Sequence, residues 1–355
     1  MSGWNARGMT EVVDRPRSAS RVRLLGGVAV VALLVVEAVL VAPALDTAAT
    51  SLANADTTWV ALAALAVAAS MVMFALTRRR LLRAAGVHAT VRDSVAAALV
   101  ANSLHATLPG GPAFSTAYNY RWMRGRGAGG AVATWCLVAG GLVSTASLVI
   151  IGLTASLLVG GGAGWTQVAL EVFGLLTVGL IARELVRRPQ PLVVAGRWAV
   201  RRVNRLRRRP ADTGLTAWDD LVAQLGAVRP RGRDWSAATG LALLNWALDV
   251  ACLAACATAL GVHVTLPLLL VAYTAGMTTS GLSPLPGGIG VVDAALVLTF
   301  VAGGVPAAQA LPVVVLYRLI SLVGVVAAGW AVCAVQHGVR PALKVKTGLP
   351  VEASP

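Results

Sequence analysis

Six ionisable side chains lie within or beside long apolar runs of the sequence. Such side chains are costly in an apolar environment and usually pair with one another or line a polar pathway. Asp293 and Arg318 carry opposite charges, so they could form an ion pair, or Arg318 could stay free for a phosphate group. Simpler roles are open to the others, such as a hydrogen bond between helices or a reach toward an aqueous interface. The six residues are Glu37, His105, Glu171, Asp249, Asp293 and Arg318.

A second chemical feature is the motif LPGG, which occurs at 108–111 and 285–288, each time inside a broken apolar stretch. Proline lacks a backbone donor and glycine adopts turn conformations, so a helix breaks at this motif. The half-helix that follows presents free N–H groups and a positive dipole end, which favour an anion such as a phosphate. The alternative is a plain turn between two short spanning helices. The candidate binding residues from the motif are Pro109, Gly110, Gly111, Pro286, Gly287 and Gly288.

The sequence gives little support for catalysis or metal binding. Cys252 and Cys256 are one helical turn apart, but no histidine or second cysteine pair completes a set of metal ligands. The sequence contains neither an HEXXH motif nor a GxxxxGKS nucleotide loop, and its histidines form no evident Ser–His–Asp set. We therefore expect no metal, no cofactor and no enzyme activity.

The composition determines which elements must position these residues. Hydrophobic residues make up 57% of the chain and charged residues 13%, with a mean hydropathy of +0.74. A soluble domain carries about 25% charged residues. A water-soluble fold of this size could not cover its surface with so few polar side chains. The composition indicates an all-α polytopic membrane protein, in which abundant small residues let helices pack closely.

Apolar runs long enough to span a bilayer, about 20 residues each, define the expected helices. Two further stretches, 93–118 and 267–302, are apolar but broken by Pro and Gly. The first run could instead belong to a signal peptide, although it is longer than a usual signal core of about 7–15 residues. The expected spans are 24–42, 58–77, 130–158, 166–186, 236–260 and 307–335.

The distribution of Lys and Arg predicts the topology. The net charge of +15 lies in short blocks between apolar runs, whereas 43–57, 159–165 and 261–306 contain no Lys or Arg. This pattern favours a membrane protein with cytoplasmic basic loops over a nucleic-acid-binding protein. The stretch 93–118 has basic flanks on both sides, and 267–302 has none. We therefore expect two re-entrant hairpins on opposite faces, arranged as an inverted repeat, with both termini cytoplasmic.

These features divide the chain into three parts. Residues 1–20 form a cytoplasmic leader, 21–336 a transmembrane domain, and 337–355 a cytoplasmic tail. The domain includes the basic cytoplasmic loop 187–234. Within that loop, 212–228 has helical spacing with one apolar face, which predicts a helix lying either at the membrane interface or against the protein's own loops.

The C-terminal quarter resembles a known family. The residues from Pro286 to Gly290, followed by Asp293, Tyr317 and Arg318, are similar to the signature of the lysylphosphatidylglycerol-synthase transmembrane-region family, also called the flippase-like domain. The likeness covers most of 20–335 and is strongest in the last quarter. The family's acidic position is more often Glu. The acid–Arg pair often found beyond its first LPGG segment is not evident around 136–141.

The resemblance implies a bacterial inner-membrane protein that binds phospholipid or moves it between leaflets. We expect no lipid-aminoacylating activity, because that activity belongs to an additional domain of the full-length synthases. The leading hypothesis is a lipid translocase for an anionic phospholipid or a polyprenyl phosphate, with no nucleic-acid partner. The alternatives are a membrane enzyme that modifies lipid head groups and a non-transporting scaffold. The expected head-group site adds Arg318, Asp293, Tyr317, Asp249 and His105 to the motif residues.

Overall fold

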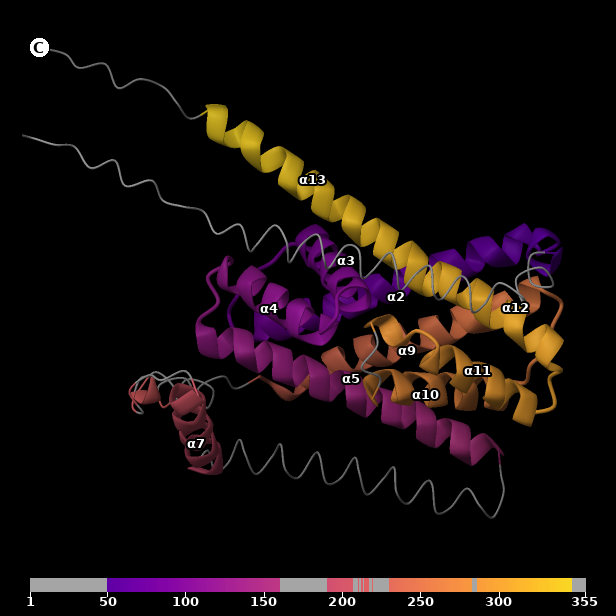
Figure 1. The fold of residues 1–355 in the computed structure, drawn as a ribbon, viewed down its shortest axis with the longest axis horizontal. Coiled ribbons are helices and arrows are strands. Elements are labelled where there is room, and N and C mark those ends of the chain that lie inside the picture. The colour runs from indigo at the N-terminus through magenta and orange to yellow at the C-terminus, as the bar shows by residue number, and fades with distance from the viewer. Residues whose placement is uncertain are drawn as a thin grey trace, which may run out of the picture.

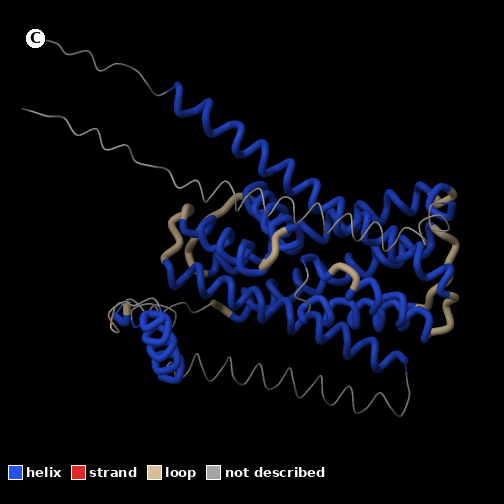
Figure 2. Tube along the Cα trace, viewed as in Figure 1, coloured by secondary structure: helices blue, strands red, loops and turns tan. Residues whose placement is uncertain are grey.

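The computed structural model describes residues 50–159, 190–206, 210, 212, 214–216, 219, 230–282 and 286–346 (Figure 1). All regular structure in these ranges is helical, with loops between the helices (Figure 2). The predicted spans 24–42 and 166–186, together with Glu37 and Glu171, lie outside the described residues, as does most of the predicted helix 212–228.

Four helical segments among the described residues are long and apolar enough to cross a membrane. Three of them are α2 (Thr57–Ala84), α5 (Gly130–Val159) and α9 (Gly232–Ala259). The fourth is formed by α12 (Ala307–Arg318), a π-helical turn (Leu319–Gly324) and α13 (Val325–Lys346), and its membrane-compatible part ends at Gln336. These segments match four of the predicted runs and confirm a polytopic α-helical membrane protein.

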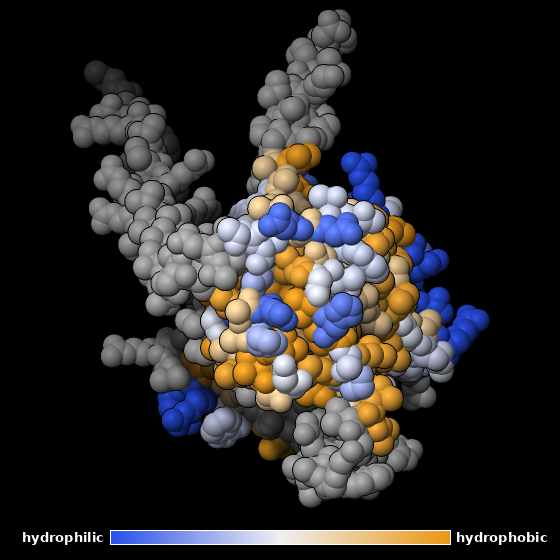
Figure 3. All heavy atoms as spheres, turned by 90° about the vertical axis from the view of Figure 1, so that its right-hand side faces the viewer, coloured by the Kyte–Doolittle hydropathy of each residue, from blue (hydrophilic) through white to orange (hydrophobic). Residues whose placement is uncertain are grey.

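Large apolar side chains remain on the outside of the bundle. Leu65, Leu157 and Leu298 are exposed to 65%, 60% and 67%. Seen from the end where α12 begins, the surface is largely apolar with hydrophilic side chains scattered over it (Figure 3). Exposed apolar surface of this extent marks an interaction surface, as is expected of a membrane protein.

Each LPGG segment joins two shorter helices into a hairpin. The first hairpin consists of α3 (Val91–Thr107) and α4 (Gly111–Arg124). The second consists of α10 (Leu266–Leu282) and α11 (Val291–Ala302), with a 3-10 turn at Pro286–Gly288. At about 1.5 Å per residue these helices are shorter than the roughly 30 Å hydrocarbon core. The hairpins enter the bundle from opposite ends (Figure 1).

The central scaffold is the pair α2 and α9. Ser70 of α2 donates a hydrogen bond to Asn245 of α9 at 3.0 Å, and the Asp56 N–H donates to the Ala259 carbonyl at 2.9 Å. A hydrogen bond between buried polar side chains removes the cost of placing them in an apolar core. Cys252 and Cys256 of α9 are fully buried in the same core, among apolar side chains.

Arginines at the end of α2 fasten the first hairpin to this scaffold. Arg78 donates to Asn119 of α4 at 2.6 Å, and Arg79 donates to the Ala89 carbonyl just before α3 at 2.8 Å. From the charge pattern alone, both guanidinium groups would be expected in solvent, but in the structure they donate to the first hairpin.

The basic loop contains a helix that the sequence pattern did not predict, α7 (Gln190–Leu206). It lies near the bundle end that carries the first hairpin and crosses the direction of the long helices (Figure 1). Arg197 pairs with Asp219 at 2.6 Å, and Arg201 approaches Asp212 at 3.8 Å.

The opposed hairpins predict that the two ends of the bundle face opposite sides of the membrane. We expect Ala308→Cys to react with an impermeant thiol reagent in intact cells, and Gly125→Cys to react only after permeabilisation. Both changes are made in a background lacking Cys136, Cys252, Cys256 and Cys333. Labelling of both positions from outside would contradict the inverted arrangement.

Candidate functional site

The guanidinium of Arg318 holds the second LPGG break in place. Its Nε donates to Asp293 Oδ1 at 2.5 Å, while Nη1 and Nη2 donate to the carbonyls of Gly287 and Gly288 at 3.4 and 3.3 Å. The side chains of Arg318 and Asp293 are only 15% and 27% exposed. One cation therefore neutralises the acid of α11 and also satisfies carbonyls that the helix break leaves without intrahelical partners.

Asp293 performs a second task at the start of α11. Its Oδ2 accepts a hydrogen bond from the Gly290 N–H at 2.9 Å. We expected the half-helix after the Gly pair to present free N–H groups to an anion. In the structure the helix's own carboxylate occupies one of these donors, because an acid at the third helical position can reach back to the N-cap. An anion at this terminus would have to compete with Asp293.

A second carboxylate, Asp249 of α9, is held by two phenols. Asp249 Oδ2 accepts hydrogen bonds from Tyr273 of α10 at 2.6 Å and from Tyr317 of α12 at 3.3 Å. Both tyrosines are fully buried. Because the three residues come from three helices, the carboxylate ties α9 to the second hairpin and to the last span.

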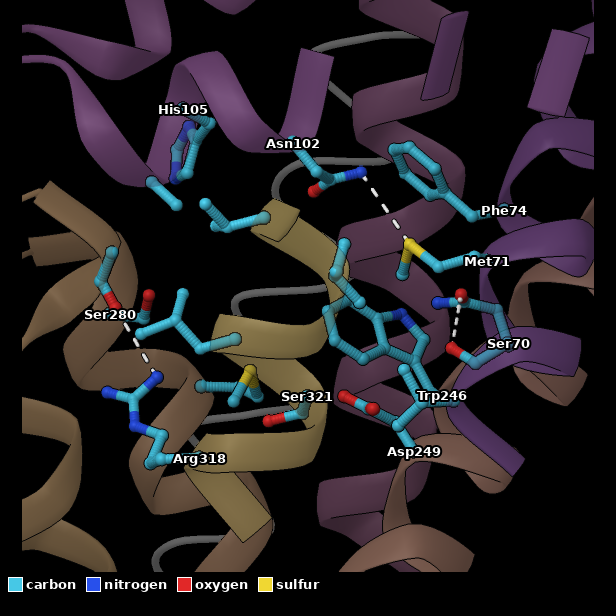
Figure 4. Close-up of a pocket in the computed structure, with 18 of the residues that line it drawn as sticks. Ser70, Met71, Phe74, Asn102, His105, Trp246, Asp249, Ser280, Arg318 and Ser321 are labelled. Atoms are coloured by element: carbon cyan, nitrogen blue, oxygen red, sulfur yellow. Dashed lines mark hydrogen bonds between the residues drawn. The ribbon is translucent and has the colours of Figure 1, made fainter. Parts of the chain in front are cut away.

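These groups surround a cavity of about 260 Å³. Its walls come from α2, α3, α5, α9, α10, the 3-10 turn and the last span, so it lies where both hairpins meet the scaffold (Figure 4). The tips of the two hairpins approach each other here, since a Cβ added to Gly287 would lie 3.5 Å from the Ala106 carbonyl oxygen. Arg318 and Asp249 extend into the cavity from opposite walls, with Ser321 between them (Figure 4).

The structure brings some of the predicted site residues together and leaves others apart. His105, Asp249, Gly287, Tyr317 and Arg318 line the cavity. Asp293 and Gly288 do not line it but bond to Arg318. The remaining motif residues, Pro109, Gly110, Gly111 and Pro286, are not among the lining residues.

Glycine is needed in both LPGG copies, although for different reasons. In the first copy Gly110 adopts a positive φ of 72°, whereas Gly111 packs so closely that an added Cβ would collide with the His105 backbone. In the second copy Gly287 and Gly288 have φ of 64° and 65°. Positive φ is accessible to glycine at little cost. The two motifs are therefore similar in sequence but differ in local geometry.

Several polar residues of the cavity were missed at the sequence level. They could have been found as uncharged polar residues inside apolar runs, where an unpaired donor or acceptor would be costly. Ser321 sits in the π-helical turn directly after Arg318, a kind of helix irregularity often found at functional sites. The missed lining residues are Ser70, Asn102, Ser144, Asn245, Trp246, Ser280 and Ser321.

The fold and the cavity define a multi-pass α-helical membrane protein with a charged internal site between two broken-helix hairpins. The profile of one family, described as lysylphosphatidylglycerol synthase TM region, matches residues 24–329. The chain belongs to this family. The match includes both hairpins and every residue that lines the cavity. Comparison with curated proteins gives no match.

The close contact between Gly111 and the His105 backbone gives a testable expectation. We expect Gly111→Ala to destabilise the protein by about 1–3 kcal/mol or more, because the added methyl group must displace the His105 backbone. Gly129→Ala is the matched control, since no atom lies within 4 Å of its added Cβ. Thermal unfolding in detergent measures the difference. Equal midpoints for the two variants would show that the close packing of Gly111 is not needed.

Proposed function

We propose that this protein is a lipid translocase of a bacterial inner membrane, which holds the head group of an anionic phospholipid or a polyprenyl phosphate in the central cavity. The observation that carries the proposal is Arg318, a cation that lines an internal cavity in a spanning helix. Intramembrane ionisable residues that face such a cavity typically mark a substrate pathway.

The remaining donors of Arg318 support a phosphate as the ligand. A guanidinium has five N–H donors. Three bonds to Asp293, Gly287 and Gly288 leave two donors, one on each terminal nitrogen, with no partner among the described residues. A planar pair of N–H groups matches the geometry of a phosphate, which accepts two parallel hydrogen bonds from arginine. Arg318 can therefore hold the LPGG break and an anion with different atoms.

The size and the walls of the cavity support a head group as the part that enters. About 260 Å³ lies just below the range of roughly 300–1,000 Å³ for sites that enclose a drug-sized ligand. A phosphodiester fits this space, whereas two acyl chains do not. In this mechanism the chains stay in the bilayer beside the exposed apolar surface while the head group crosses through the protein.

Opposed hairpins support alternating access to the cavity. Backbone that is not helical is tolerated at membrane depth only where it is buried or lines a cavity. Gly287 of the second LPGG segment lines this cavity, and so do His105 and Ala106, just before the first segment. In transporters with inverted repeats, one repeat rocks against the other around a fixed site. We propose the same motion for this protein, with re-entrant hairpins and both termini in the cytoplasm. In this proposal the protein moves the lipid without modifying it.

A double-mutant cycle separates lipid binding from structural pairing. We expect Arg318→Leu to lose its co-purifying anionic lipid and to be destabilised by about 3 kcal/mol, because the change strands the partly buried Asp293. Asp293→Leu leaves the cation in the cavity and should retain lipid. The double variant should recover part of this stability without recovering lipid, because the Gly287 and Gly288 carbonyls and the Gly290 N–H still lack their side-chain partners. Native mass spectrometry and thermal unfolding provide the two readouts. Recovery of both in the double variant would leave Arg318 with a structural role alone.

Transport itself is tested in vesicles that contain the purified protein and a fluorescent phosphatidylglycerol. We expect the wild-type protein to expose inner-leaflet lipid to an external quencher, and the Arg318→Leu, Asp293→Leu double variant to do so at least about tenfold more slowly. Arg92→Gln, which removes an exposed cation outside the cavity lining, is the control. Wild-type lipid exchange no faster than that of protein-free vesicles would refute translocation and favour the scaffold. Chemically altered lipid in the same vesicles would favour an enzyme.

A further inference from the structure

A second hollow lies on the outside of the bundle, between α4 and α5. Its volume is about 780 Å³, and it is separate from the central cavity. Small side chains form most of its floor on α4, namely Pro112, Ala113, Thr116 and Ala117, and Leu137 of α5 closes the other side. Arg121 stands at the far end of this groove.

The length of the groove matches one leaflet of a bilayer. Pro112 and Arg121 are nine positions apart in a continuous helix, which corresponds to about 14 Å at roughly 1.5 Å per residue. Half of the roughly 30 Å hydrocarbon core is about 15 Å. Pro112 adjoins the LPGG break at the hairpin tip. Arg121 lies in the last turn of α4, at the basic end of the bundle, which also carries Arg124 and the arginines at the end of α2. The groove therefore runs from the interior of the membrane to its surface.

Within the described residues, the charge of Arg121 at the surface end of the groove has no partner. Nearby cations have partners: Arg124 donates to the Ala128 carbonyl at 2.9 Å, and Arg126 pairs with Asp93 at 3.1 Å. A hydrogen bond from Arg126 keeps the pKa of the Asp93 carboxyl below its ordinary value. By contrast, the Arg121 guanidinium has no hydrogen-bond or ion-pair partner within the described part of the chain.

Aromatic residues place this end of α4 at the level of lipid head groups. Tyr120 lines the groove beside Arg121, and Trp122 stacks under Arg126 with the guanidinium carbon 4.0 Å from the ring centre. Tyr and Trp concentrate where the hydrocarbon core meets the polar interface, because their rings have an apolar body and a polar edge.

We propose that the groove between α4 and α5 binds a phospholipid of the leaflet on the basic side, with its phosphate on Arg121 and an acyl chain along Ala117, Ala113 and Pro112. The groove has small apolar residues below Arg121, a cation without a partner among the described residues, and so matches the polarity of a phospholipid along its length. This site does not depend on translocation through the central cavity, because the two hollows share no lining residue.

A second copy of the chain fits the groove less well. A copy in the same orientation within the same membrane would present its own basic end at the level of Arg121. The chain has a net charge of +15, and its basic residues concentrate at this end. Like charges at one depth repel each other, whereas an anionic lipid neutralises them.

The test uses the full-length protein in nanodiscs that contain phosphatidylglycerol carrying a photoactivatable group on one acyl chain. After illumination we expect cross-links in peptides that cover 112–117 and 134–137. Ala117→Phe, which fills the groove, should remove these cross-links, and Arg121→Gln should reduce them about tenfold. The matched controls are Ala68→Phe on the exposed surface of α2 and Arg92→Gln, both of which should leave the yield unchanged.

The results separate this site from the translocation site. Cross-links that persist at wild-type yield in Ala117→Phe, or an equal loss in Arg121→Gln and Arg92→Gln, would overturn the groove proposal. Links between two protein chains at 112–117 would overturn it in favour of a second copy. In the Arg318→Leu, Asp293→Leu variant, the groove cross-links should remain even though the central lipid is lost. A failure of translocation therefore leaves this result intact.

Discussion

The second LPGG break depends on the guanidinium of Arg318. A helix broken inside an apolar bundle leaves carbonyls without intrahelical partners, and an acid at the start of the next half-helix adds a charge. Arg318 bonds to Asp293 and to the carbonyls of Gly287 and Gly288 at once. Each of these groups would be costly alone. The same interaction fixes the last span against the hairpin tip, and this contact forms one wall of the cavity.

Polarity in the cavity is maintained by hydrogen bonds that reach across the fold. Asp249 accepts hydrogen bonds from Tyr273 and Tyr317 on two other helices, and Ser70 of α2 donates one to Asn245 of α9. Partners on different helices make the site a product of helix packing rather than of any one segment. A site of this kind keeps its shape only while the helices remain in register, so changes in cavity shape require movement of whole helices or hairpins.

Much of the fold could be predicted from the sequence because the cost of burying charge in lipid is so large. Run length gave the spans now seen at α2, α5, α9 and the last helix, and the same cost singled out Arg318 and Asp249. The partners of Asp249 could not be predicted, since Tyr273 and Tyr317 lie 24 and 68 positions away and meet it only through packing. The helix α7 was missed because its arginines and apolar residues were interpreted as a basic loop.

The two hairpins share a motif but are stabilised by different physical means. Gly111 lets the first hairpin close by direct contact with the His105 backbone, and Arg78 fastens α4 from the scaffold through Asn119. The second hairpin relies on the ion pair at Arg318 and on glycines with positive φ. An anion in the cavity would interact directly with the electrostatic network of the second hairpin. The first hairpin reaches the lining through Asn102, His105 and Ala106, but its Gly111 contact and the Arg78–Asn119 bond lie outside it. Within the proposed mechanism, a bound head group would therefore act on the Arg318 contacts more strongly than on the first hairpin.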